Sequence, residues 1–410
     1  MELFKVHSIE NAKKRVLEVF SDLKIKTEKI AIMESLNRVS AEIVKSKINV
    51  PHFNRSTVDG YAVISGDVQG TSESMPMMLD IIGESEMGKE NSYEILNGQC
   101  IYVPTGGMLP KGADSVVMIE YTEIFGEKSI AVYKPAATKE NTMSIGDDVL
   151  VDQEVMEKNQ VIRSKDIGVL AAIGVKKIEV YKKPEVVLIS TGDEIVDDID
   201  DLEVGKILDI NTYTIVNLLK ASGAVAIKTH VVKDEYDPLK ETIINSMAEA
   251  DLVIVSGGSS MGEKDNTAKI FDEVGDVGVF IHGISIKPGK PTIVARGDDI
   301  PLLGLPGQPV SAMIVYRVIV DFLLQNIFKT IGLVEKKEMR ILDRNVFASP
   351  GKDTYLMMRH YEEDGNLYIT PVYGKSGMIN LIAASTGYIV VNEDLEGYRK
   401  GEMVDFYHFI

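Results

Sequence analysis

Two helical patterns of apolar residues stand on either side of a long non-helical segment. Directly after Ser8, a residue type that caps helices, apolar residues recur at helical spacing. These residues are Ile9, Ala12, Val16 and Phe20. A second helical pattern covers residues 164–173 and ends at Gly174, as helices commonly do. We expect the two helices to pack together, which makes the segment between them an insertion.

The intervening segment, residues 29–148, predicts a β-rich domain. Its apolar residues form short runs separated by Gly, Pro, Asn and Asp, a pattern typical of strands joined by turns. The clearest runs cover residues 77–82, 100–103, 115–119 and 130–133.

From residue 185 to residue 332, apolar runs of strand length alternate with longer helical patterns. This alternation indicates βαβ units and a parallel sheet. The predicted strands cover residues 186–190, 225–232 and 252–255, and the predicted helices begin near Thr212, Pro238 and Val310. After residue 335 the chain returns to short β-like runs such as residues 387–391.

These patterns predict a multidomain protein of the α/β and β classes, with a central parallel-sheet α/β domain. The predicted domains are a discontinuous helical linker domain (1–28 and 149–183), an inserted β-rich domain (29–148), the α/β domain (184–332) and a small C-terminal β domain (333–410). A length of 410 residues with 45% hydrophobic content agrees with two to four domains.

Charge and cysteine content exclude several function classes. A formal net charge of −18 argues against nucleic acid and anionic membranes as partners. Cys100 is the only cysteine, so an internal disulfide and a thiolate metal cluster are excluded, and a metal would need carboxylate ligands. The sequence contains no long uncharged apolar stretch and no secretory pattern at its start, so we expect a cytoplasmic protein.

Polar and glycine-rich turns follow the predicted strands of the α/β domain. Ser256, Gly257 and Gly258 open a loop whose backbone N–H groups can donate hydrogen bonds to phosphate oxygens. A flexible turn is the alternative interpretation of this loop. Ligands of open parallel sheets bind outside the carboxyl ends of the strands, which predicts one crevice surrounded by three carboxylates. The three are Glu194, Asp234 and Asp265.

Two further turns of this domain could supply contacts for an oxyanion. Lys287 and Lys290 flank a Pro-Gly pair and reverse the acidic character of the chain locally, although such a turn can also be simply solvated. Pro306 and Pro309 precede a helical pattern, so their turn either binds an anion or only begins the helix. In the β-rich domain, residues 54–62, 104–110 and 146–148 are dense in turn residues and could form the second wall of a cleft.

The order of these segments resembles the MoeA family of molybdopterin molybdenumtransferases, which is related to the E domain of gephyrin. The matching segments are Ser-Thr-Val-Asp-Gly-Tyr-Ala at 56–62, Pro-Thr-Gly at 104–106, Ser-Thr-Gly-Asp-Glu at 190–194, Ser-Gly-Gly at 256–258, Gly-Glu at 262–263 with Asp265, Lys-Pro-Gly-Lys-Pro at 287–291, and Gly-Leu-Pro-Gly-Gln-Pro-Val-Ser-Ala at 304–312. The resemblance covers essentially the whole chain.

The resemblance implies an elongated homodimer of four-domain subunits, with each active site between the α/β domain of one subunit and the β-rich domain of the other. The implied reaction inserts molybdate, or tungstate, into adenylylated molybdopterin with Mg²⁺-assisted release of AMP. The implied catalytic residues are Asp59, Thr105, Asp148, Glu194, Asp234 and Asp265. The implied substrate-binding residues are Ser256, Gly257, Gly258, Lys287, Lys290, Pro306 and Pro309, and Mg²⁺ would be held by Glu194, Asp234 and Asp265.

Two alternatives come from other functional classes. A scaffold could keep the fold, as the receptor-clustering role of gephyrin shows is possible, and a molybdopterin adenylyltransferase would need only the α/β domain. The sequence also departs from the family at two places. Gln308 stands where many members have Asn, and the segment Lys-Ser-Gly at 375–377 is only loosely similar to the family pattern.

Overall fold

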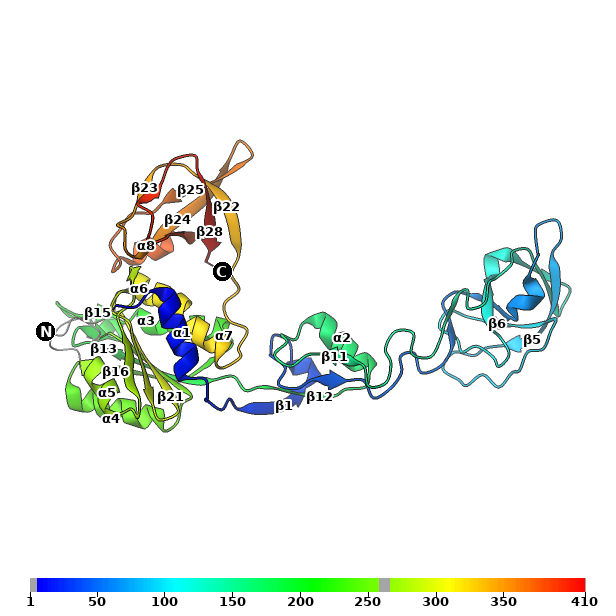
Figure 1. The fold of residues 1–410 in the computed structure, drawn as a ribbon, viewed down its shortest axis with the longest axis horizontal. Coiled ribbons are helices and arrows are strands. Elements are labelled where there is room, and N and C mark those ends of the chain that lie inside the picture. Colours follow the sequence, from blue (N-terminus) through cyan, green and yellow to red (C-terminus); the bar gives the residue numbers. More distant parts are fainter. Residues whose placement is uncertain (1–5, 258–265, 410) are drawn as a thin grey trace. The chain divides into compact units, whose positions relative to one another are not determined.

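The computed structural model describes residues 6–257 and 266–409 of the chain, which divides into two compact units (Figure 1). The first unit contains Met1–Ile30, Asn37–Ala41 and Glu179–Ile410. The second unit contains Ala31–Leu36 and Glu42–Ile178. The four domain boundaries derived from the sequence stay a prediction.

The centre of the first unit is a six-stranded sheet with the order β16-β13-β17-β21-β20-β18. Its strands are β16 (Val225–Val232), β13 (Glu185–Thr191), β17 (Leu252–Ser256), β21 (Ile300–Leu305), β20 (Ile293–Gly297) and β18 (Gly278–His282). The first four are parallel, but β20 is antiparallel to β21 and to β18. The prediction of a parallel sheet is therefore wrong for β20, which runs opposite to the other five strands. β20 and β21 are joined by a two-residue turn at Asp298, where φ is 51°, and a turn this short can join only antiparallel strands.

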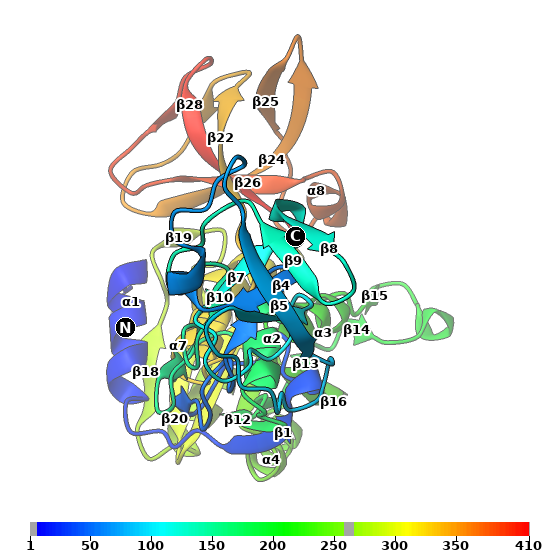
Figure 2. The same cartoon turned by 90° about the vertical axis from the view of Figure 1, so that its right-hand side faces the viewer.

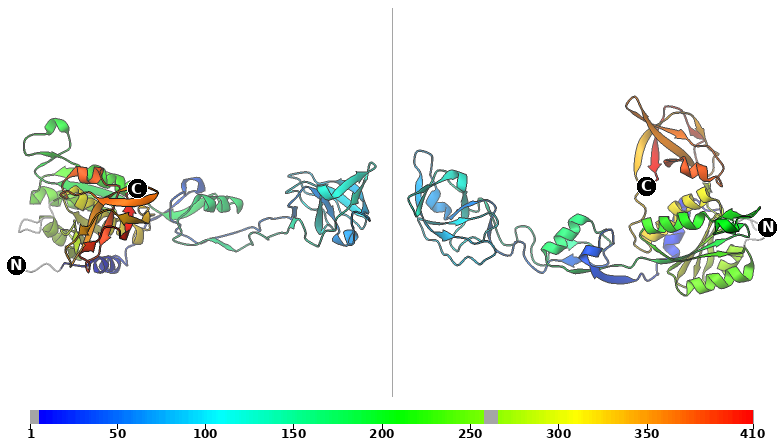
Figure 3. Two further views of the ribbon diagram at one scale, coloured as in Figure 1. Left: turned by 90° about the horizontal axis from the view of Figure 1, so that it is seen from above. Right: turned by 180° about the vertical axis from the view of Figure 1, so that it is seen from behind.

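Helices cover both faces of this sheet, because alternate residues of each strand point to opposite faces. Val187 and Ile189 pack in the core that contains α4 (Tyr236–Met247) and α5 (Asn266–Glu273). Val186 and Leu188 pack in the core of the other face (Figures 1 and 3). The helical elements there are α1 (Ile9–Val19), α3 (Asn211–Ala221), α6 (Pro309–Val315), the π-helical segment η5 (Tyr316–Val320) and α7 (Asp321–Asn326).

The first predicted helix forms where expected but packs elsewhere. The hydroxyl of Ser8 accepts a hydrogen bond from the Asn11 N–H at 3.3 Å, which caps α1. Ala12, Val16 and Phe20 are buried in the core of the α/β sheet. The predicted packing of α1 against the second helix, α2 (Ser164–Ala172), is therefore wrong. The helical period identified the apolar stripe of α1, but any apolar surface of matching shape could cover it.

The C-terminal part of the first unit is a second six-stranded sheet (Figure 2). Its strands, in spatial order, are β19 (Ile286–Lys287), β24 (Asp353–Glu363), β25 (Asn366–Pro371), β22 (Lys337–Leu342), β28 (Met403–His408) and β26 (Gly387–Val391). A short helix, α8 (Ile379–Ala383), lies between this sheet and α6 (Figure 1). Residues 337–408 with α8 are called the C-terminal module below.

The second unit contains the predicted β-rich domain. Its six-stranded sheet has the order β7-β4-β6-β5-β9-β8. The strands are β7 (Ser115–Met118), β4 (Gly60–Val63), β6 (Gln99–Val103), β5 (Met77–Glu84), β9 (Ser129–Val132) and β8 (Thr122–Phe125). Smaller pairs are β3 (Arg55–Ser56) with β10 (Thr142–Met143), and β2 (Val44–Lys45) with β11 (Glu154–Met156). The four predicted apolar runs all become strands of the large sheet. Within residues 6–257 and 266–409, no helix is long and apolar enough to cross a membrane.

Candidate active site

The parallel strands of the first unit end side by side, which gathers their loops at one edge of the sheet. Thr191 at the end of β13 lies beside Val232 at the end of β16. On the other side, Ser190 lies beside Ser256, and Ser256 lies beside Leu305 at the end of β21. The carboxyl ends of these four strands therefore lie side by side along one edge of the sheet, which is called the rim below.

Glu194 and Asp234 belong to neighbouring turns of this rim. Glu194 is exposed. A Cβ at position 192 would lie 2.8 Å from its Oε2, so the absence of a side chain at Gly192 leaves room for the Glu194 carboxylate. Gly192 donates its N–H to the Val232 carbonyl at 3.3 Å, which ties this turn to the segment leading to Asp234. The two carboxylates predicted from separate strands are thus on adjacent loops.

The predicted Mg²⁺ site is described only in part. Asp265 and Gly258 lie outside the described residues. Within residues 6–257 and 266–409, no group of three His, Cys, Asp or Glu side chains is arranged to hold a metal. Asn266, which follows Asp265, donates its side-chain N–H to the Asp234 carbonyl at 3.1 Å. Asn266 therefore lies beside the Asp234 loop, and the carboxylate of Asp234 is a ligand type that a hard divalent cation prefers.

Ser256 and Gly257 begin the predicted anion-binding loop in a tightly packed backbone. Gly257 has φ of +102°, and a Cβ there would lie 2.1 Å from the Thr191 carbonyl oxygen, so only glycine fits. Asn211, at the start of α3, donates its amide to the Ser256 hydroxyl at 2.8 Å and to the Gly307 carbonyl at 2.9 Å. One buried amide therefore joins the loop after β17 to the turn after β21.

The basic turn that contains Lys287 and Lys290 lies at the same edge. Ile293, where β20 begins, pairs with Gly304 near the carboxyl end of β21, so the turn preceding β20 is beside the rim. Gly289 has φ of +115°, and a Cβ there would approach Val315 of α6 to 2.6 Å. Because Gly289 has no side chain, the turn can pack closely against α6. Both lysine side chains stay exposed.

Pro306 and Pro309 enclose the turn that leads from β21 into α6. Pro306 is buried, and Pro309 is the first residue of α6, where its missing N–H costs no helical hydrogen bond. Between them, Gln308 accepts a hydrogen bond from the Ser376 hydroxyl. The sequence alone did not identify this partner for Gln308.

In the second unit, Asp59 and Thr105 form one hydrogen-bonded pair. Asp59 Oδ1 accepts from the Thr105 N–H at 2.7 Å and from the Thr105 hydroxyl at 3.0 Å, and both residues are exposed. Asp148 is also exposed, on a loop whose backbone donates to the Val50 carbonyl at 3.0 Å. The structure thus brings Asp59 and Thr105 together and gives no direct bond from either to Asp148.

Three family descriptions match consecutive parts of the chain. They are "MoeA N-terminal region (domain I and II)" over residues 7–174, "Probable molybdopterin binding domain" over residues 187–326, and "MoeA C-terminal region (domain IV)" over residues 340–409. A molybdopterin biosynthesis protein of Methanocaldococcus jannaschii is 35% identical over 420 residues, which is 99% of each chain. The chain belongs to the MoeA family.

Other relatives carry the same family name or an enzyme name. A molybdopterin molybdenumtransferase of Haemophilus influenzae is 29% identical over 403 residues, covering 97% of each chain. Two crystal structures of the MoeA protein from Pyrococcus horikoshii match with TM-scores of 0.83 and 0.82, at 33% and 29% identity. Each covers 99% of this chain and 100% of the other. The MoeA fold predicted from the sequence is confirmed.

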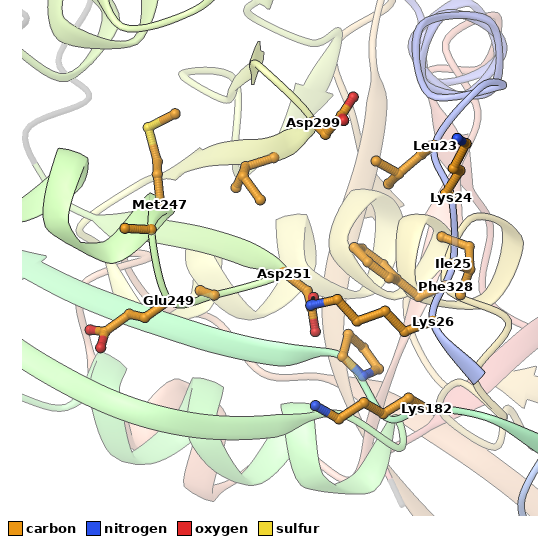
Figure 4. A pocket seen from close by; sticks show the side chains of 14 residues that line it. Leu23, Lys24, Ile25, Lys26, Lys182, Met247, Glu249, Asp251, Asp299 and Phe328 are labelled. Carbon is orange, nitrogen blue, oxygen red and sulfur yellow. Dashed lines mark hydrogen bonds and ion pairs between the residues drawn. The ribbon is translucent and has the colours of Figure 1, made fainter. Parts of the chain in front are cut away.

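A separate cavity of this MoeA chain lies away from the candidate site (Figure 4). It has a volume of about 330 Å³ and is lined at the amino ends of the strands by Pro184, Ala250 and Ile300. Lys26 and Asp251 form an ion pair of 2.7 Å across it. Because this cavity is at the edge of the sheet opposite the rim, it does not belong to the site described above.

Sequence reasoning missed two residues that organise the MoeA site. Asn211 and Ser376 both act through hydrogen bonds to residues 45 to 96 positions away, which a single sequence does not reveal. A local signal existed for Asn211 only. Asp209 accepts from the Thr212 N–H at 3.1 Å and from its hydroxyl at 2.6 Å, a capping arrangement that the Asp-Ile-Asn-Thr segment could have indicated.

Proposed function

We propose that this chain is a molybdopterin molybdenumtransferase that inserts molybdate into adenylylated molybdopterin and releases AMP. Membership of the MoeA family assigns the chain to molybdenum cofactor biosynthesis. The observation that carries the proposal is the rim at the carboxyl edge of the sheet. There, two acidic turns, the start of a glycine-containing loop and a turn with two lysines follow neighbouring strands.

The rim residues bind and orient the reactants. Lys287 and Lys290 attract the oxyanion and the phosphate groups. The Gly257 N–H is taken by the Leu305 carbonyl at 3.1 Å, so backbone donors to phosphate oxygens would have to come from the chain after Gly257. Glu194, Asp234 and Asp265 would hold Mg²⁺, which when bound neutralises negative charge on the pyrophosphate. Catalysis on this account comes from positioning and electrostatic stabilisation, with no covalent protein intermediate.

The second wall of the site is proposed to come from a partner subunit, as the family resemblance implies. Asp59 Oδ1 accepts two hydrogen bonds from Thr105, so the Thr105 hydroxyl proton is already donated. The oxygen of that hydroxyl is then left as an acceptor held in one orientation. Asp59, Thr105 and the exposed Asp148 would face the pterin and oxyanion from the partner. We place the homodimer in the cytoplasm, with no nucleic acid or membrane partner.

The proposal is tested by incubating the purified protein with adenylylated molybdopterin, Mg²⁺ and molybdate or tungstate. We expect AMP release together with retention of the metal on molybdopterin. Glu194→Gln should reduce AMP release by about 10- to 1000-fold, because it removes one charge that would bind the cation. Glu241→Gln, on the exposed side of α4, is the matched control and should leave the rate unchanged. Pterin binding without AMP release by the wild type would favour a scaffold.

A further inference from the structure

Ser376 of the C-terminal module makes two hydrogen bonds with the Pro306–Pro309 turn and the residue that follows it. The Ser376 hydroxyl donates to the side-chain oxygen of Gln308, and the Ser376 carbonyl accepts from the Val310 N–H at 3.2 Å. Val310 is in the first turn of α6, where backbone N–H groups have no partner inside the helix. Ser376 therefore holds both the side chain and the backbone of the turn.

The same module also holds the basic turn, at a different place. The strand β19, which ends at Lys287, is an outer strand of the C-terminal sheet and pairs in parallel with Asp353 and Thr354 of β24. The Ser285 hydroxyl donates to the Gly351 carbonyl at 2.8 Å, which extends this attachment by one residue. Two turns of the rim, the basic turn and the proline turn, are thus fastened to one module.

The length of the Gln308 side chain accounts for the contact with Ser376. An Asn at this position would place its amide one carbon–carbon bond, about 1.5 Å, closer to the backbone. That shortening is enough to lose a hydrogen bond to a hydroxyl fixed on another module. The long side chain of Gln308 and the position of Ser376 therefore fit each other.

We propose that Gln308 and Ser376 are positioning residues that fix the proline turn for substrate binding. The hydrogen bond sets the turn relative to Lys287 and Lys290, which the same module holds, so the anion contacts keep one spacing. This inference rests on the proposed function, because the bound anion is the phosphate or oxyanion of that reaction. Neither residue takes part in the chemistry.

The test measures KM and kcat for adenylylated molybdopterin in variants of the full-length protein. Ser376→Ala and Gln308→Asn should each raise KM by about 3- to 10-fold, the effect of one neutral hydrogen bond, with kcat nearly unchanged. The double variant should be no worse than either single one, because both remove the same bond. Ser376→Thr keeps a hydroxyl and should restore most of the affinity.

Ser385→Ala is the matched control in the same module, because its hydroxyl donates to the Leu381 carbonyl within α8. It should leave KM unchanged. An unchanged KM in Ser376→Ala and in Gln308→Asn, or effects that multiply in the double variant, would overturn the proposal.

Hydrogen exchange separates this proposal from the proposed function. Ser376→Ala should accelerate exchange of the backbone amides of Gly307, Gln308, Val310 and Ser311, whatever reaction the protein catalyses. Absence of AMP release by the wild type with faster exchange in the variant would refute only the function. Unchanged exchange in an active enzyme would refute only the positioning role.

Discussion

At the scale of single residues, Asn211 connects loops that the sequence presents as independent. It is buried, and it joins Ser256 to Gly307 with two hydrogen bonds. Replacing it removes both bonds and leaves a buried hydroxyl and a carbonyl with fewer partners. The amide is therefore a structural centre of the rim.

We predict that Asn211→Ala lowers the free energy of unfolding by about 1–3 kcal/mol, the cost of leaving buried polar groups without partners. Urea unfolding followed by circular dichroism measures this change. Asn217→Ala, on the exposed face of the same helix, is the control and should change stability by less than about 0.5 kcal/mol. Equal effects of the two substitutions would contradict the assigned role of Asn211.

Gly257→Ala is expected to disrupt the rim through the backbone. The added Cβ would lie 2.1 Å from the Thr191 carbonyl oxygen, at a φ of +102° that side chains avoid. We predict a loss of at least about 1–3 kcal/mol in unfolding free energy together with a large loss of AMP release. Gly168→Ala in α2, where a Cβ meets nothing within 4 Å, should instead stabilise by up to about 1 kcal/mol. A Gly257→Ala enzyme with normal stability and activity would show that the loop does not need glycine.

The sequence predicted the rim acids because strand ends can be recognised locally. Glu194 and Asp234 each follow an apolar run, and parallel pairing then brings them to one edge. Asn211 and Ser376 could not be found in the same way. Their partners are set by tertiary packing between elements far apart in the chain, and no local pattern specifies such a pair.

At the scale of elements, apolar periodicity identified the strands better than their directions. The runs that became β13, β16 and β17 were predicted, and the sheet core is made of them. The antiparallel β20 was not expected, because its direction follows from the short turn at Asp298 and not from its composition. The predicted packing partner of α1 was also wrong, since an apolar helical stripe determines which face of the helix is buried but not which element covers it.

The ladder between β22 and β28 contains a carboxylate that makes stability depend on pH. Lys336 Nζ lies 2.6 Å from Glu338 Oε1. Lys336, together with His408 and Arg340, lowers the pKa of Glu338 to about 2. A carboxyl whose pKa is lower in the folded state stabilises the fold above its ordinary pKa of 4.5, and this contribution is lost as the pH falls toward 2.

We therefore expect wild type and Glu338→Gln to differ most in Tm at neutral pH, with the wild type higher. The difference should shrink as the pH is lowered from 5 toward 2, because protonation removes the same charge that the substitution removes. Thermal unfolding across this pH range measures it. A difference in Tm that stays constant with pH would show that Glu338 acts through packing instead of charge.

At the scale of the whole molecule, the proposal is that each site takes residues from two subunits. The residues assigned to the reaction are divided between the units: Asp59 and Thr105 are in the second, and Glu194 is in the first. If each site takes its walls from two chains, an inactive variant of one wall can complement an inactive variant of the other.

We predict that mixing Asp59→Ala with Glu194→Gln after dissociation and reassociation restores activity. In a random mixture half of the dimers are mixed, and each of these has one intact site, so about a quarter of wild-type activity should return. Light scattering should give a mass of twice 45.1 kDa. No recovery in a mixture shown to contain mixed dimers would place both walls in one chain.

The most direct test of the central claim is a single incubation of the purified protein with adenylylated molybdopterin, Mg²⁺ and molybdate. AMP and protein-bound molybdenum are then measured together. The account predicts that AMP appears in step with molybdenum retained on molybdopterin, and that Glu194→Gln reduces both by at least about 10-fold while Glu241→Gln changes neither. Binding of the pterin nucleotide with no release of AMP, in the presence of either molybdate or tungstate, would contradict it.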